Sequence, residues 1–124
     1  MHLYIYLQAR DISTISFQTP FKSFLRNEFP ELVIFEADQA SDPSHIQTGV
    51  KFIDEADRII LHIEDDGKTS LGSNMKLLEK LRKAKCQKRI FYSGSTKTIV
   101  SSLKMLSAEY LQNDFEVEIR NFLK

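Results

Sequence analysis

A short apolar run in the middle of the chain constrains the fold more than any other feature. It lies within D-R-I-I-L-H-I-E-D-D-G, from Asp57 to Gly67. Its residues Ile59 to Ile63 are apolar apart from one histidine, and they do not alternate with polar residues. A run of this kind that ends in acids and a glycine is typical of a strand covered on both faces. The sequence therefore predicts a buried central strand with helices on both sides.

Other short strand-like segments occur along the chain, separated by segments with helical periodicity. They are Leu3–Leu7, Leu32–Phe35, Arg89–Tyr92 and, near the end, Glu109–Gln112. Strand and helix alternate without a hairpin signal such as Asn-Gly, which predicts a parallel sheet with right-handed crossovers. We expect one α/β domain over residues 1–124, a three-layer sandwich with a five-stranded parallel sheet in the flavodoxin-like order 2-1-3-4-5.

Capping residues predict where the helices begin. Thr19 before Pro20 and Asp42 before Pro43 each pair an N-cap residue with a proline at the first helical position. Ser73 is the expected N-cap of the third helix.

The C-terminal segment can be interpreted in two ways. Asn113, with Glu116 three residues later, resembles a capping box and predicts a helix over Asp114–Leu123. The alternating apolar residues from Phe115 to Ile119 are also compatible with a strand. We favour a short fifth strand followed by a terminal helix.

Composition limits the classes of partner and compartment. Seventeen basic and seventeen acidic residues cancel, so the overall charge gives no reason to expect nucleic acid as a partner. The single Cys86 excludes an internal disulfide and fits a reducing compartment. The sequence shows neither a signal peptide nor an apolar run of the roughly 20 residues that a membrane helix needs. We therefore expect a cytoplasmic protein that does not bind membranes.

In a sheet of this order, ligands bind beyond the carboxyl ends of the strands, where the strand order reverses. The sequence places polar side chains after the first, second, third and fourth strands. We expect the ligand-binding residues there to be Gln8, Arg10, Asp11, Glu36, Asp38, Glu64, Ser93, Ser95 and Thr96. Asp65 and Asp66 in the same region, together with Glu79, are the candidate catalytic residues, because neighbouring acids shift one another's pKa values.

Most named motifs are missing from the sequence. Gly67-Lys68-Thr69-Ser70 lacks the first glycine of a phosphate-binding loop, and no G-x-G-x-x-G follows the first strand. The three histidines lack the spacing of metal ligands, so we expect no metal site and no bound cofactor. His62 is expected to be a hydrogen-bonded core residue. The basic run from Lys80 to Arg89 is interpreted as a solvated helix end rather than a phosphate site.

One family resemblance can be stated. The A-D-R-I-I-L-H-I strand after an amphipathic helix, the acid-glycine loop and the A-E-Y-L-Q-N-D-F-E segment resemble the nucleoside 2-deoxyribosyltransferase and Toll/interleukin-receptor-like group of flavodoxin-like proteins. Those transferases carry a catalytic glutamate on the helix after the third strand. Here Met75 and Lys76 occupy the start of that helix, and its first acid is Glu79.

Two functions remain open at this point. The first is a non-catalytic regulatory or protein-interaction module with a crevice for a small nucleotide-like ligand. The second is a hydrolase or transferase that cleaves the N-glycosidic bond of nucleosides or nucleotides, with Asp65, Asp66 or Glu79 as nucleophile or base. The missing glutamate at the start of the third helix favours the first.

Overall fold

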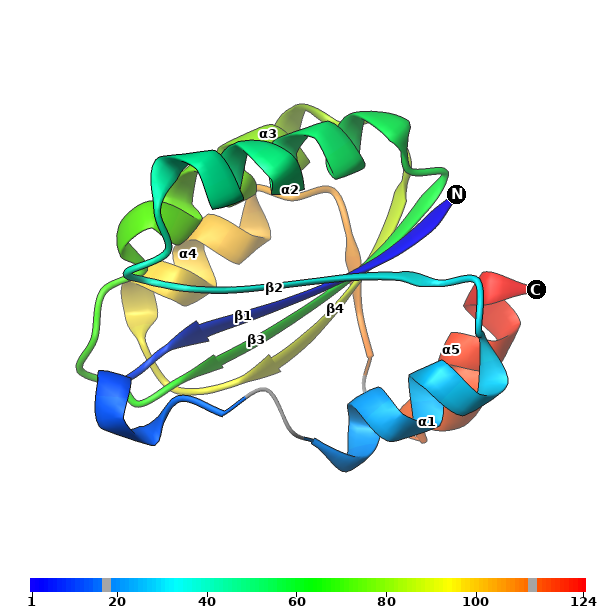
Figure 1. The fold of residues 1–124 in the computed structure, drawn as a ribbon, viewed down its shortest axis with the longest axis horizontal. Helices are drawn as coiled ribbons and strands as arrows, with labels where there is room; N and C mark the ends of the chain where they lie inside the picture. Colours follow the sequence, from blue (N-terminus) through cyan, green and yellow to red (C-terminus); the bar gives the residue numbers. More distant parts are fainter. Residues whose placement is uncertain (17–18, 112–113) are drawn as a thin grey trace.

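The computed structural model describes residues 1–16, 19–111 and 114–124 (Figure 1). Its centre is a parallel sheet in the order β2-β1-β3-β4-β5, which confirms the predicted flavodoxin-like topology. The strands are β1 (His2–Ala9), β2 (Val33–Asp38), β3 (Arg58–Asp65), β4 (Gln87–Ser93) and β5 (Glu109–Tyr110). The predicted fifth strand ends earlier than expected, and Gln112 lies outside the described residues.

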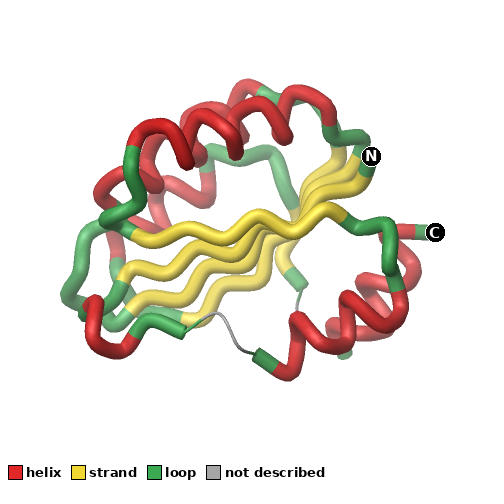
Figure 2. The backbone as a smooth tube through the Cα atoms, viewed as in Figure 1, coloured by secondary structure: helices red, strands yellow, loops and turns green. Residues whose placement is uncertain are grey.

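Helices cover both faces of the sheet, as predicted. One layer holds α2 (Pro43–Glu55), α3 (Met75–Lys83) and α4 (Lys97–Lys104), and the other holds α1 (Pro20–Glu28) and α5 (Phe115–Leu123) (Figures 1 and 2). Two short 3-10 helices, η1 (Ile12–Thr14) and η2 (Gly72–Asn74), follow β1 and precede α3. No helix of the described residues is long and apolar enough to cross a membrane.

The central strand β3 explains why the apolar run does not alternate. Ile59, Leu61 and Ile63 are buried in the core beneath α2, α3 and α4. Ile60 is buried in the second core, beneath α1 and α5. Burying each of these side chains contributes about 1.5–3 kcal/mol. Because both faces of β3 are covered, polar alternation along this strand would bury charge without a partner.

Two of the predicted N-caps are confirmed. The Thr19 hydroxyl oxygen accepts a hydrogen bond from the Lys22 amide at 3.1 Å, and α1 begins at the next residue, Pro20. The Asp42 carboxylate accepts one from the His45 amide at 2.9 Å at the start of α2. These bonds satisfy donors that a helix start otherwise leaves unpaired.

Ser73 was predicted to cap α3, and this prediction is wrong. It lies inside the 3-10 helix η2, and its hydroxyl donates to the backbone oxygen of Gln39 at 3.0 Å. The hydroxyl therefore ties η2 to the end of β2, and α3 begins two residues later, at Met75.

The C-terminal segment is a helix, so the alternative of a strand over Phe115–Ile119 is wrong. The residue that caps it is Asp114, whose carboxylate accepts from the Val117 amide at 3.4 Å. The predicted capping residue Asn113 lies outside the described residues. The apolar residues of α5 repeat at helical spacing, and Ile119, Phe122 and Leu123 are buried against the sheet. Burial of that face therefore decides between the two interpretations.

Candidate functional site at the carboxyl edge of the sheet

The loops after β1 and β3 meet at the point where the strand order reverses, and Asp66 joins them. Its backbone amide donates to the Ala9 oxygen at 3.1 Å. Its carboxylate accepts from the Lys68 and Thr69 amides at 2.9 and 2.8 Å, and from the Asp11 amide at 3.3 Å. These backbone hydrogen bonds, chiefly those from Lys68 and Thr69, lower the Asp66 pKa to about 2. The expected crevice between β1 and β3 is therefore bridged by the protein's own hydrogen bonds.

Both carboxylate oxygens of Asp65 also accept hydrogen bonds, from donors that include a residue at the start of α4. Its Oδ1 accepts from the Thr96 hydroxyl at 2.9 Å and from the Gly67 amide at 2.8 Å. Its Oδ2 accepts a short hydrogen bond from the Tyr92 hydroxyl, which in turn accepts from the Thr96 amide at 3.1 Å. Burial and the bond to Asp65 raise the Tyr92 pKa to about 12. Through the Thr96 hydroxyl, Asp65 is joined to the N-cap residue of α4.

Gly94 packs directly against the Asp65 carboxylate. A Cβ atom at position 94 would lie 2.1 Å from Asp65 Oδ2, much closer than non-bonded atoms approach. Only a residue without a side chain fits between β4 and this carboxylate in the observed arrangement.

Glu64 lies on the other face of the sheet and belongs to a partly buried chain of polar side chains. Its Oε2 accepts from the Tyr6 hydroxyl at 2.7 Å and lies 3.5 Å from Nη1 of Arg10. Its Oε1 lies 3.4 Å from Nε2 of His62, whose Nδ1 bonds the Tyr4 hydroxyl at 2.7 Å. The interaction with His62, followed by the bond from Tyr6, lowers the Glu64 pKa against the opposing effect of burial. Burial raises the pKa values of Tyr4 and Tyr6.

The sequence analysis missed part of this chain. Tyr4 and Tyr6 were treated only as strand residues, although His62 was expected to be a hydrogen-bonded core residue, as the structure shows. The sequence did contain a signal for this chain. Two alternate positions of β1 are tyrosines, Tyr4 and Tyr6, and two alternate positions of β3 are His62 and Glu64. The parallel register pairs Tyr6 with His62, and this brings all four side chains to one face. The His62 ring is stacked between Tyr6 and Phe91, at centroid distances of 4.6 and 4.5 Å.

The structure brings some predicted binding residues together at the carboxyl edge. Gln8 is fully buried, and its Oε1 accepts from Arg10 Nη1 at 3.4 Å and from the Ser16 amide at 3.3 Å. Asp11 caps η1 through bonds from Ser13. Glu36 forms an ion pair with Lys22 at 2.5 Å. These side chains therefore already have partners within the fold.

Three other predicted residues are exposed to solvent. Ser93 and Ser95 are exposed at the turn between β4 and α4. Glu79 is exposed on α3 and lines a groove between α3 and α4 rather than the edge between β1 and β3. The structure therefore does not bring the three candidate catalytic acids into one site.

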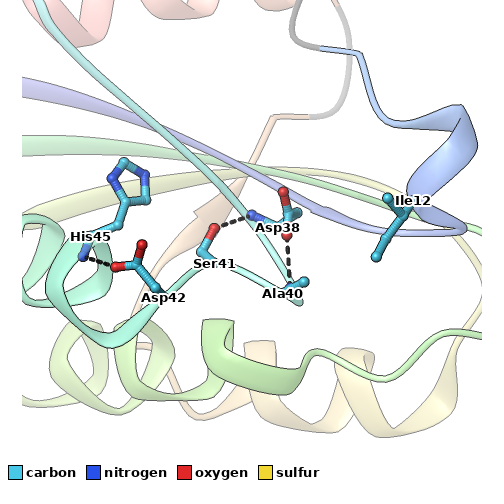
Figure 3. Close-up of a pocket in the computed structure, with 6 residues that line it drawn as sticks. All are labelled: Ile12, Asp38, Ala40, Ser41, Asp42 and His45. Atoms are coloured by element: carbon cyan, nitrogen blue, oxygen red, sulfur yellow. Dashed lines mark hydrogen bonds between the residues drawn. The ribbon is translucent and has the colours of Figure 1, made fainter.

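A shallow pocket of about 340 Å³ opens beside the ends of β1 and β2 (Figure 3). Ile12 comes from η1, Asp38 is the last residue of β2, and His45 lies in the first turn of α2. The other lining residues belong to the connection between β2 and α2. Asp38 Oδ1 accepts from the Ala40 amide at 2.7 Å, and Asp42 Oδ1 accepts from the His45 amide at 2.9 Å. The pocket thus offers a hydrophobic side chain on one side and two carboxylates on the other.

Within the described residues, no group of three or more histidine, cysteine or acidic side chains is arranged to hold a metal ion. Comparison with known proteins adds no family: no protein-family model matches the chain, and no curated protein sequence matches it.

Proposed function

We propose that this chain is a non-catalytic regulatory module that acts through contacts with protein chains. The observation that supports this proposal most is the set of hydrogen bonds across the predicted crevice. Asp66 links the loops after β1 and β3 through backbone and side-chain hydrogen bonds at the point where a nucleotide-like ligand is expected. A ligand entering there would have to break these bonds.

The hydrogen-bond partners of the acids support the same proposal. A general base or nucleophile needs a carboxylate oxygen within reach of the substrate. The Asp65 oxygens accept three internal hydrogen bonds, and those of Asp66 accept four. Glu79, the third candidate, lies on another part of the surface.

The competing hypothesis is a nucleoside hydrolase or transferase, as the resemblance to the deoxyribosyltransferase group suggests. Glycoside-cleaving enzymes generally use a pair of carboxylates that flank the scissile bond, roughly 5 to 9.5 Å apart. That activity would require Asp65 or Asp66 to leave its present partners when the substrate binds.

A thermal-shift screen combined with a product assay separates the two hypotheses. The purified chain is melted with nucleosides, nucleotides and flavins, and the same mixtures are analysed for released base. A ligand at 100 times its Kd adds about 2.7 kcal/mol of stability. We expect no saturable stabilisation and no free base. Saturable stabilisation or base release by the wild type would overturn the proposal, and loss of that effect in D66A would locate the site.

A further inference from the structure

An apolar groove runs between α3 and α4, and one acid and one base are among the residues that line it. It measures about 200 Å³, and the side chains of Met75 and Met105 beside it are 39% and 58% exposed. Leu78 and Leu106, both buried, line it as well. Methionine is flexible and polarisable, so such a groove adapts to an inserted aliphatic side chain.

The two helices that form this groove carry an excess of positive charge. Their sequences M-K-L-L-E-K-L-R-K and K-T-I-V-S-S-L-K contain a single acid, Glu79. Among the described residues, Lys80 forms an ion pair with Asp54, whereas no ion pair is formed by five other cations: Lys76, Arg82, Lys83, Lys97 and Lys104. Arg82 lines the groove itself, as does Glu79.

The complementary surface is at the carboxyl edge of the same molecule. Ile12 is 67% exposed, more than any other large hydrophobic side chain in the described parts of the chain. It sits on η1, which is fixed by hydrogen bonds from the Ser13 amide and hydroxyl to the Asp11 carboxylate at 2.9 and 2.7 Å. The exposed Ile12 side chain, called the knob below, is therefore carried on a fixed backbone before any partner binds. This lowers the entropic cost of docking.

The carboxylates around Ile12 retain acceptor capacity. Asp38 and Asp42 line the pocket beside Ile12, and each uses Oδ1 for its internal hydrogen bonds. Within the described residues, the Oδ2 atom of neither aspartate accepts a hydrogen bond. A guanidinium or ammonium group would form charge-assisted hydrogen bonds with these two oxygens.

We propose that the protein self-associates head to tail, with the Ile12 knob and its acidic pocket on one copy docking onto the α3–α4 groove of the next. The inference rests on the proposed function, since it names the contact through which the module acts. Ile12 fills the groove between Met75 and Met105, and Arg82 of the accepting copy pairs with Asp38 and Asp42 of the other.

Charge favours a second copy as the occupant. The formal net charge is zero, so copies do not repel one another at long range, while two aspartates flank Ile12 and the helices that form the groove carry an excess of positive charge. Knob and groove are different surfaces. The contact is therefore heterologous, and each copy can bind one neighbour at each end.

The test is sedimentation velocity of the whole chain over a concentration series from micromolar to millimolar, at low and high salt. We expect the weight-average sedimentation coefficient to rise with concentration and the rise to shrink at high salt. I12D removes the knob and M105D removes the groove, so each variant alone should stay monomeric. Their equimolar mixture keeps one intact knob and one intact groove and should form 1:1 dimers that grow no further.

Controls separate lost contact from lost folding. V117D introduces the same charge at a 46% exposed position on α5, in the opposite layer, and should associate like the wild type. R82E leaves the apolar groove intact and should weaken association at low salt. Circular-dichroism melts check that every variant is folded.

A wild type that stays monomeric throughout the series would overturn the inference, and so would a mixture of I12D and M105D that stays monomeric. Undiminished association of either single variant would place the contact on another surface and would also overturn it. None of these outcomes affects the ligand screen, so failure of the self-association is distinct from failure of the proposed function.

Discussion

Asp65 is the residue at which β3, β4 and α4 meet. It accepts hydrogen bonds from a tyrosine, a threonine and a glycine amide, and the Gly94 backbone packs against it. A partly buried acceptor that serves several donors costs more to remove than any one of its bonds is worth, because each donor is then left unpaired. Both carboxylate oxygens of Asp65 therefore have partners within the fold.

The contact between Gly94 and Asp65 predicts a strong coupling between the two positions. G94A places a Cβ where Asp65 Oδ2 lies and should destabilise the protein by about 1–3 kcal/mol, as overpacking of a tight site does. In a D65A background the obstructing carboxylate is absent, so the same substitution should cost close to nothing. Urea denaturation of the four proteins of this cycle measures the coupling. Equal costs of G94A in both backgrounds would show that the two residues do not pack as described.

Tyr92 predicts a loss of stability at high pH. Its pKa is raised from 10.0 to about 12 in the folded protein, so folding favours the neutral hydroxyl. The stabilisation is complete below pH 10 and is lost as the pH rises through about 12. The stability difference between wild type and Y92F should therefore be constant up to pH 10 and shrink above it. Tyr4 and Tyr6 are common to both proteins and cancel. A difference that grows above pH 10 would contradict the assignment.

At the scale of secondary-structure elements, β3 determines the fold. Leu61 lies in the middle of this strand and is buried beneath α2, α3 and α4. L61D would bury a charge without a partner and should abolish cooperative folding, while L61A should cost about 2–5 kcal/mol. V117D, at an exposed position of α5, is the matched control and should fold normally. A soluble L61D protein with a cooperative melt would show that this strand is not central.

Much of this element order could be predicted from sequence, because it follows from local signals. Apolar runs located the strands, and Thr19-Pro20 and Asp42-Pro43 located two helix starts. Ser73 failed as a cap because its hydroxyl bonds the Gln39 oxygen, a residue 34 positions away that no local pattern reveals. Local chemistry thus predicts where elements lie better than it predicts how they are tied together.

For the candidate site, too, the position could be predicted from the sequence, but the partners of its side chains could not. Its position at the carboxyl edge follows from topology, and Gln8, Arg10, Asp11, Asp65 and Asp66 do lie there. The partners of these side chains are set by contacts between distant segments, such as the bond from the Tyr92 hydroxyl to Asp65 across 27 positions. The sequence of the loop that contains Asp65 and Asp66 does not reveal whether its acids act on a substrate or form hydrogen bonds between loops.

At the scale of the whole molecule, charge is segregated although it sums to zero. Cations are concentrated on α3 and α4. At the carboxyl edge of the sheet, Asp11 is hydrogen-bonded to Asp66, and Asp38 and Asp42 line one pocket with Ile12. The loops that Asp66 joins by hydrogen bonds therefore also carry acidic side chains at the surface.

An NMR titration of the isotope-labelled protein with nucleotides and with sulfate, up to millimolar ligand, tests the closed crevice most directly. The backbone amides of Asp11, Asp66, Lys68 and Thr69 report on it, because all four donate the hydrogen bonds that join or shape these loops. The account predicts that these amide resonances do not move along a saturable curve. Saturable shifts at these four amides would show that the edge opens to a ligand and would contradict the account.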